Sequence, residues 1–130
     1  MSKTSVSMSS EHLRDLIVQL LEDKKATDIH VVDFRGRSPL TDFVVVASGT
    51  SGRHVTSLAE LIREAMHKER IPILSIEGLG EGDWVLVDLN DVVVHLFKSD
   101  IRAQYDLENL WATGEMELNS KRKTLKPKEP

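Results

Sequence analysis

The chain has 130 residues, a length that suits one domain, and 40% of them are hydrophobic, enough for a core. It contains no cysteine, which excludes disulfides, thiolate metal sites and a thiol nucleophile. No apolar run approaches the ~18 residues that span a membrane, so we expect a soluble cytoplasmic protein in which residues 1–9 are disordered.

Charge is distributed unevenly along the chain. Residues 121–130 hold five Lys or Arg and one Glu, a net charge of +4, so the overall charge of −4 leaves −8 on residues 1–120. An acidic body repels phosphate groups and suits a basic protein partner better than a nucleic-acid duplex. We interpret residues 112–130 as a polar, basic tail that is either a disordered solubilising end or a contact to RNA.

Three helices are expected from the spacing of apolar residues. The first follows Ser10, a predicted N-cap, and ends near Lys24. The second carries apolar residues at helical spacing from Val55 to Met66, and Pro72 requires it to finish by about Arg70. The third spans residues 101–111.

Five strands are expected from short apolar runs. They cover residues 28–34, 43–47, 73–76, 84–88 and 91–97. A strand, a helix and a strand in succession suggest a right-handed parallel crossover. The order of the elements predicts a single α/β domain over residues 10–111, in which helices flank a mixed sheet of about five strands.

The segment SGTSGR, residues 48–53, lies between a predicted strand and a helix. Glycine-rich loops at helix N-termini can cradle phosphate. However, the spacing matches neither GxxxxGK[ST] nor GxGxxG, so we favour a simple strand-to-helix turn with a Ser or Thr N-cap.

The carboxylates of Asp42, Asp88 and Asp91 are the candidates for a Mg²⁺ site of the nucleotidyl transferase type, if their strands are neighbours. Asp88 and Asp91 flank a predicted hairpin turn, where Asp is a favoured residue, so we favour the turn interpretation. The five histidines contain no HExxH pattern, and no metal or cofactor is predicted. We expect His95 to be half-buried and hydrogen-bonded.

The predicted hairpin turn at Leu89-Asn90 is more informative. Asn90 tolerates the positive φ of a tight turn, but an apolar Leu89 does not follow from turn chemistry. Trp84 begins the same hairpin, and Tyr105 and Trp111 follow on the third helix. Trp and Tyr are enriched at interface hot spots. We therefore predict a protein-binding surface at Trp84, Leu89 and Tyr105, and place Trp111 in the core.

The motifs of the chain closely resemble those of the Iojap family, the bacterial ribosomal silencing factors. The segments that carry the resemblance are TDFVVVASGTSGRHV, EGLGEGDWVLVDLNDVVVHLF and RAQYDLENLW. Together they lie within residues 28–111. The chain differs from the family pattern at Asn90, where Gly is usual, and at Glu69-Arg70, where a Gly commonly ends the second helix.

The resemblance implies a fold similar to the nucleotidyl transferase core without its catalytic carboxylates. It also implies binding to the large ribosomal subunit through large-subunit protein fourteen. The bound factor would sterically block subunit joining and so repress translation when nutrients are scarce. It places Trp84, Leu89 and Tyr105 at the partner surface, assigns no contact to Asp88, Asp91 or His95, and implies homodimers in crystals.

Two other functions stay open from the sequence. One is a small nucleotide-binding or nucleotidyl transferase-like enzyme that uses the SGTSG loop and Asp42. The other is a structural homodimer in which the apolar strip around Trp84 and Leu89 pairs with itself.

Overall fold

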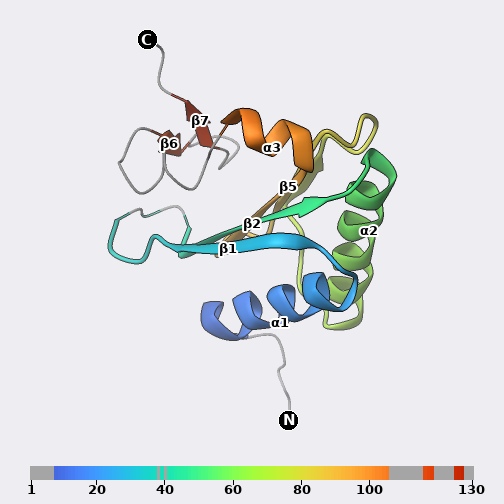
Figure 1. The fold of residues 1–130 in the computed structure, drawn as a ribbon. Coiled ribbons are helices and arrows are strands. Elements are labelled where there is room, and N and C mark those ends of the chain that lie inside the picture. Colours follow the sequence, from blue (N-terminus) through green and yellow to red (C-terminus); the bar gives the residue numbers. More distant parts are fainter. Residues whose placement is uncertain (1–7, 38, 40, 106–115, 119–124, 128–130) are drawn as a thin grey trace.

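The computed structural model describes residues 8–37, 39, 41–105, 116–118 and 125–127 (Figure 1). The helices are α1 (Ser10–Asp23), α2 (Gly52–Lys68) and α3 (Ser99–Tyr105). The main sheet contains, in chain order, β1 (Thr27–Asp33), β2 (Phe43–Gly49), β3 (Ser75–Glu77), β4 (Trp84–Asp88) and β5 (Val92–Lys98).

The main sheet has the strand order β1-β2-β5-β4-β3. The central pair, β2 and β5, is parallel, and the other neighbouring pairs are antiparallel. These directions make β3 parallel to β2, with β5 and β4 between them. The predicted α/β fold with a mixed five-stranded sheet is therefore confirmed, and the connection through α2 is a parallel crossover.

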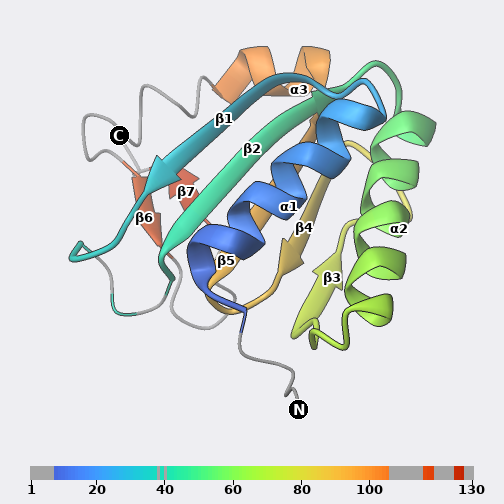
Figure 2. The same ribbon diagram turned by 90° about the horizontal axis from the view of Figure 1, so that it is seen from below.

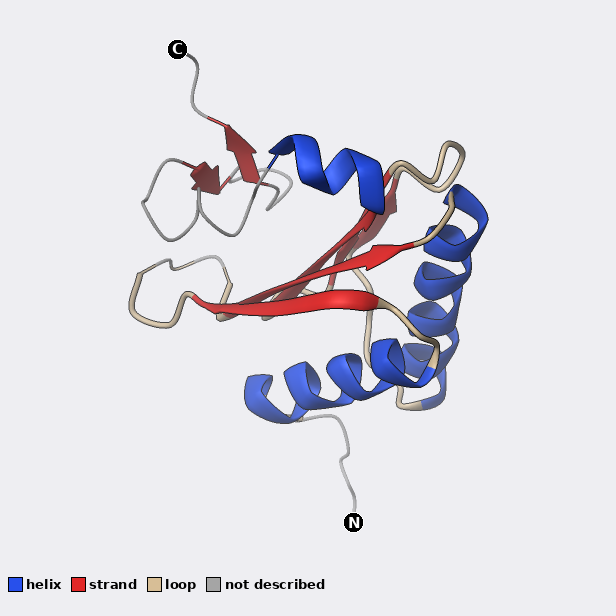
Figure 3. Cartoon of the chain, in the orientation of Figure 1, coloured by secondary structure: helices blue, strands red, loops and turns tan. Residues whose placement is uncertain are grey.

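Helices cover both faces of the sheet. Figures 1 and 3 show α1 and α3 on opposite sides of the strands, and Figure 2 shows α1 lying across the sheet with α2 beside it. Alternate residues of a strand face opposite sides, so β5 contributes Val94 and Leu96 to the core beneath α1 and α2, and Val93 and Phe97 to the core beneath α3. Because β2 and β5 are buried on both faces, their sequences are nearly continuous apolar runs.

Two details of α1 and β2 differ from the sequence prediction. The N-cap of α1 is Ser9 rather than Ser10, because the Ser9 side chain accepts a hydrogen bond from the amide of His12 at 3.1 Å. Strand β2 continues past Ala47 to Gly49. Polar Ser48 fits a buried strand because its hydroxyl is an acceptor for Arg102.

Arg102 attaches α3 to the sheet. Its guanidinium donates from Nη1 to Ser48 Oγ at 2.9 Å and to the carbonyl oxygen of Asp28. Asp28 has a φ of 51° next to an irregularity in the β1–β2 register. A second contact, from Ser99 Oγ to the Gly49 carbonyl at 3.0 Å, holds the first turn of α3. The helix thus begins at Ser99, two residues earlier than predicted.

A second, two-stranded sheet pairs β6 (Met116–Leu118) with β7 (Leu125–Pro127) in antiparallel fashion. No strand was predicted in this polar segment, because its hydrophobic pattern is too short to indicate one. Trp111, the predicted end of the third helix beyond Tyr105, and residues 1–7 lie outside the described residues.

The helix end that lacks the expected glycine keeps the usual hydrogen bonds. The amide of Ile71 donates to the Met66 carbonyl at 2.9 Å, and that of Arg70 to the His67 carbonyl at 3.1 Å. This pair of bonds is the Schellman motif, which requires a left-handed residue after the C-cap. Arg70 takes this role with a φ of 59°. A side chain in this conformation costs about 1 kcal/mol.

Replacing Arg70 with glycine therefore removes strain. We expect Arg70→Gly to raise the free energy of unfolding by about 1 kcal/mol, measured by urea denaturation. Glu64→Gly, in the exposed interior of α2, is the matched control and should lower it by about 1 kcal/mol. If Arg70→Gly instead lowered the free energy of unfolding, the contacts of the Arg70 side chain would stabilise the fold by more than the strain of its positive φ destabilises it.

Candidate functional site

The β4–β5 hairpin turns at Asn90 and Asp91. Asp88 pairs with Val93, which places Leu89 opposite Val92, and the Leu89 amide donates to the Val92 carbonyl at 3.0 Å. Asn90 has a φ of 76°, as its side chain predicts, and its amide donates to Asp88 Oδ1 at 2.9 Å. The turn is thus one residue later than predicted.

This shift changes the expected environment of Leu89. With the turn one residue later, Leu89 belongs to the strand ladder and continues the alternation of Val85 and Val87. Leu89 is only 4% exposed and packs with Val85 and Val87 in the core beneath α1 and α2. The prediction that Leu89 is exposed at the hairpin tip is therefore wrong.

Trp84 lies at the other end of β4 and on the other face of the sheet. Its side chain is half-buried and packs against the core beneath α3. The indole Nε1 donates to Nδ1 of His95 at 2.9 Å, and its ring centroid lies 4.7 Å from that of Phe97. Trp84 and Leu89 are five positions apart along the strand, about 16 Å. The structure does not bring these two predicted residues together.

His95 is completely buried, not half-buried as predicted. Burial in this apolar face lowers the pKa of the imidazole to about 3, because the charged form is desolvated. The ring is therefore neutral at neutral pH. The contact between His95 and Trp84 was not predicted, although the period of the strands places both residues on one face, within two positions of each other.

The third predicted contact, Tyr105, is the last residue of α3, and its side chain lies outside the described part of the chain. Helix α3 starts directly after β5, whose Phe97 pairs with Trp84. Ile101 of α3 and Trp84 pack against the same apolar cluster. The backbone thus brings the start of α3 close to Trp84, and Tyr105 lies about 9 Å further along the helix.

The SGTSG loop is closed by contacts within the protein. The Thr50 amide donates to His54 Nδ1 at 3.0 Å, and the His54 amide donates to Ser51 Oγ, the N-cap of α2, at 3.1 Å. The backbone at Gly82, in the loop between β3 and β4, lies directly against this segment. A Cβ on Gly82 would lie 2.6 Å from the Gly52 carbonyl oxygen. These contacts support the turn interpretation over a phosphate cradle.

The carboxylate candidates have local structural contacts. Asp88 accepts the turn amide, and the backbones of Asp42 and Asp91 bond to each other. Among the residues that the structure describes, no three His, Cys, Asp or Glu side chains gather in a way that could hold a metal ion. Turn chemistry therefore accounts for Asp88 and Asp91 of the hairpin.

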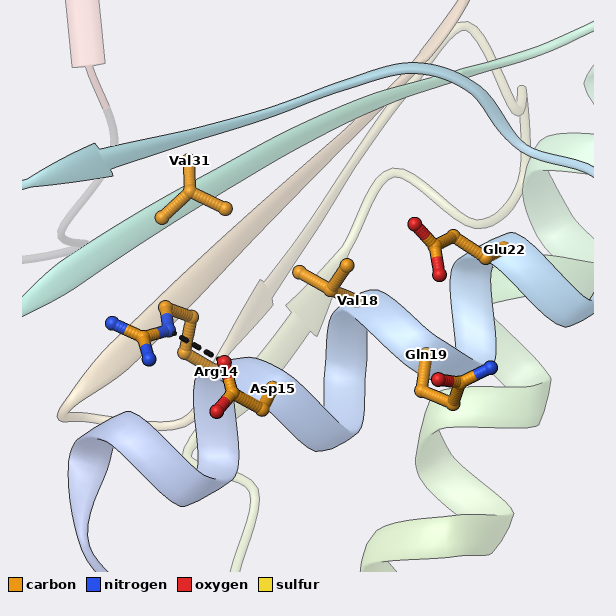
Figure 4. Close-up of a pocket in the computed structure, with 6 residues that line it drawn as sticks. All are labelled: Arg14, Asp15, Val18, Gln19, Glu22 and Val31. Carbon is orange, nitrogen blue, oxygen red and sulfur yellow. Dashed lines mark hydrogen bonds and ion pairs between the residues drawn. The ribbon is translucent and has the colours of Figure 1, made fainter.

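An open groove of about 490 Å³ lies between α1 and the edge strand β1 (Figure 4). Val18 and Val31 form its apolar part, and Arg14 donates to Asp15 at 2.9 Å at one end. This hydrogen bond lowers the pKa of Asp15. The groove combines a small apolar patch with an internally paired charge, and it lies on the α1 side of the sheet, away from Trp84.

Known proteins provide an independent comparison. A family model described as "Ribosomal silencing factor during starvation", RsfS, matches residues 7–130. The chain belongs to the RsfS family. It is 35% identical over 113 residues to the ribosomal silencing factor RsfS of Zymomonas mobilis, covering 87% of this chain and 85% of that protein. The RsfS of Halalkalibacterium halodurans is 38% identical over 104 residues, covering 80% and 89%.

A crystal structure of a Chromobacterium violaceum protein has the same fold, with a TM-score of 0.77, 36% identity, and coverage of 81% of this chain and 88% of that one. The Iojap-family resemblance is thus confirmed. The RsfS model matches up to residue 130, so it also covers the basic tail, which lies beyond the resembling segments of residues 28–111. In the described part of the chain, no helix is long and apolar enough to cross a membrane.

The buried imidazole makes stability depend on pH. In the unfolded chain His95 takes up a proton below pH 6.5, whereas the folded protein resists protonation down to a pKa of about 3. Stability is therefore full above pH 6.5 and falls as the pH drops from 6.5 to 3. We expect His95 to lower the free energy of unfolding by about 2 kcal/mol between pH 7 and pH 5.

Urea denaturation at the two pH values measures this difference. His95→Leu should remove about 2 kcal/mol of the pH dependence. His67→Gln, which changes an exposed histidine of α2, is the control. Equal pH dependence in wild type and His95→Leu would refute the assignment.

The burial of Leu89 predicts a stability defect. Truncation of a buried leucine leaves a cavity, so Leu89→Ala should lower the free energy of unfolding by about 2–4 kcal/mol in urea denaturation. Asn90→Gly, which keeps the positive φ of the same turn without strain, provides a comparison at the exposed neighbour. A change below about 0.5 kcal/mol for Leu89→Ala would place this side chain at the surface instead.

Proposed function

We propose that the chain is a ribosomal silencing factor. It binds the large ribosomal subunit through large-subunit protein fourteen, blocks joining of the small subunit, and represses translation in the cytoplasm when nutrients are scarce. Membership of the RsfS family supports the ribosome-silencing role. The resemblance of the hairpin motifs to the family supports the choice of partner protein and the steric mode of action.

The observation that carries the proposal is the half-buried indole of Trp84 at the edge of the α3 face. A tryptophan that already packs on one side and is exposed on the other offers a large rigid contact at low entropic cost. We propose that Tyr105, the last residue of α3, belongs to the same surface. Leu89 is part of the proposed site in a different way, because its buried side chain stabilises the hairpin that carries Trp84.

Steric exclusion follows from occupancy alone. Residues 1–120 carry a net charge of −8, because the tail accounts for +4 of the overall −4. An acidic body attracts a basic ribosomal protein and raises the rate of encounter. Burial of Trp84 and Tyr105 then provides the apolar part of the interface. No bond is made or broken in this mechanism.

Alanine substitution at the surface tests the proposal. We expect Trp84→Ala and Tyr105→Ala each to weaken binding to purified large subunits at least about thirtyfold, since truncating a hot spot costs about 2 kcal/mol. Co-sedimentation measures the affinity, and adding small subunits then measures joining. The control is Leu74→Ala, which truncates a 58% exposed leucine beside β3.

Unchanged binding in both variants would refute the surface, and wild type that binds without blocking joining would refute the steric mechanism. Light scattering on the same samples measures the mass of each variant in solution and so tests for a homodimer. A change of mass in solution without a change in ribosome binding would assign the Trp84 surface to a homodimer instead.

A further inference from the structure

We propose that His95 is a positioning residue for the partner surface: its Nδ1 atom fixes the orientation in which the half-exposed Trp84 indole meets the ribosomal protein. This inference rests on the proposed function. It adds a residue to which neither the sequence motifs nor the family resemblance assigns a role at the interface.

The chemistry of the two rings sets the direction of the hydrogen bond. An indole nitrogen is only a donor. The 2.9 Å contact from Trp84 Nε1 therefore makes His95 Nδ1 the acceptor, and the proton of the neutral imidazole is on Nε2. A protonated ring would carry a hydrogen on both nitrogens and could not accept from the indole.

The surroundings of His95 favour the accepting form. The ring lies in the apolar face beneath α3, with its centroid 6.2 Å from the Phe97 ring and 5.8 Å from the indole. Among the described residues, the ionisable side chains that share this face in the other elements are His30 of β1, Glu77 of β3, Asp88 of β4 and Arg102 of α3. Burial alone, rather than any of these groups, lowers the pKa of His95.

Two contacts together define one position for the indole. Phe97 packs against the ring system at 4.7 Å, which limits its tilt, and His95 binds the Nε1 hydrogen, which selects one of the two ways in which the ring can face. A side chain ordered before binding loses less conformational entropy in the complex. The completely buried His95 thus acts on the interface through Trp84 and does not touch the partner.

The test compares an acceptor with a non-acceptor at position 95. His95→Asn can keep an amide oxygen near the position of Nδ1, whereas His95→Leu fills the apolar site without an acceptor. At pH 7.5 we expect His95→Leu to bind purified large-subunit protein fourteen about tenfold more weakly than wild type. His95→Asn should bind within about threefold of wild type.

A spectroscopic measurement separates positioning from general destabilisation. The indole N–H resonance of Trp84, assigned with Trp84→Phe, should shift in His95→Leu and stay near its wild-type position in His95→Asn. In the Trp84→Phe background, which has no indole donor, His95→Leu should have no further effect on binding. Urea denaturation of each variant gives the folded fraction for which the affinities are corrected.

The outcomes distinguish this inference from the proposed function. If wild type does not bind the ribosomal protein, the proposed function fails, and the partner-directed role of His95 fails with it. If wild type binds and His95→Leu binds equally well, only the positioning role is overturned. An equal loss from His95→Leu in the wild-type and Trp84→Phe backgrounds would also overturn it, because the effect would not pass through the indole.

Discussion

Because Asp88 pairs with Val93 across the β4–β5 hairpin, each side chain of the candidate site has a fixed face of the sheet. Trp84 and His95 lie under α3, and Leu89 lies under α1 and α2. A displacement of β4 by one residue would exchange the faces on which Trp84 and Leu89 lie. The hydrogen bond from the Asn90 amide to Asp88 helps to hold the turn in place. The site therefore depends on this register.

This register defines two buried faces only if the face opposite α1 and α2 is also covered. Among the described elements, α3 covers it. Seven residues are too few for a helix that is stable alone. Arg102 compensates by inserting its guanidinium between Ser48 and the Asp28 carbonyl, which links β1, β2 and α3. Burial lowers the pKa of Arg102, because the charged guanidinium loses part of its contact with water. The Asp28 backbone, with its positive φ, presents the carbonyl to this charge.

Much of this fold could be predicted from the sequence, because its patterns are local. The apolar runs of β2 and β5, the stripe of α2 and the positive φ of Asn90 each follow from a few neighbouring residues. Strand order could not be predicted, because a fully apolar strand pairs equally well on either edge. The environment of Leu89 was predicted wrongly, because the turn was placed one residue too early, which left Leu89 at the hairpin tip instead of in the strand ladder opposite Val92.

The candidate site shows the same limit. Trp84 was predicted from its residue type, but its bond to His95 depends on two strands whose register the sequence does not specify. Arg102 gave no signal, because a lone arginine on a short helix is usually solvated. At the N-terminus of α2 the opposite happened. The glycine pattern there suggested phosphate binding, but its glycines have a structural role. Gly52 and Gly82 allow two backbones to touch, a role that needs small residues as strictly as phosphate binding does.

The contacts at the Trp84 end of the sheet suit the proposed recognition role. Several polar groups there are held by contacts within the protein: His95 Nδ1 accepts from the indole, Asp83 contacts Lys98 at 3.6 Å, and Arg102 binds the sheet. A catalytic centre needs polar groups that become available to a substrate, whereas a protein-binding surface needs a rigid apolar contact with satisfied polar neighbours. The half-buried Trp84 indole, which packs on Phe97 and donates to His95, supports the proposed protein-binding role. Its rigidity derives from the same apolar face that keeps His95 neutral, so the core and the proposed interface share one set of contacts.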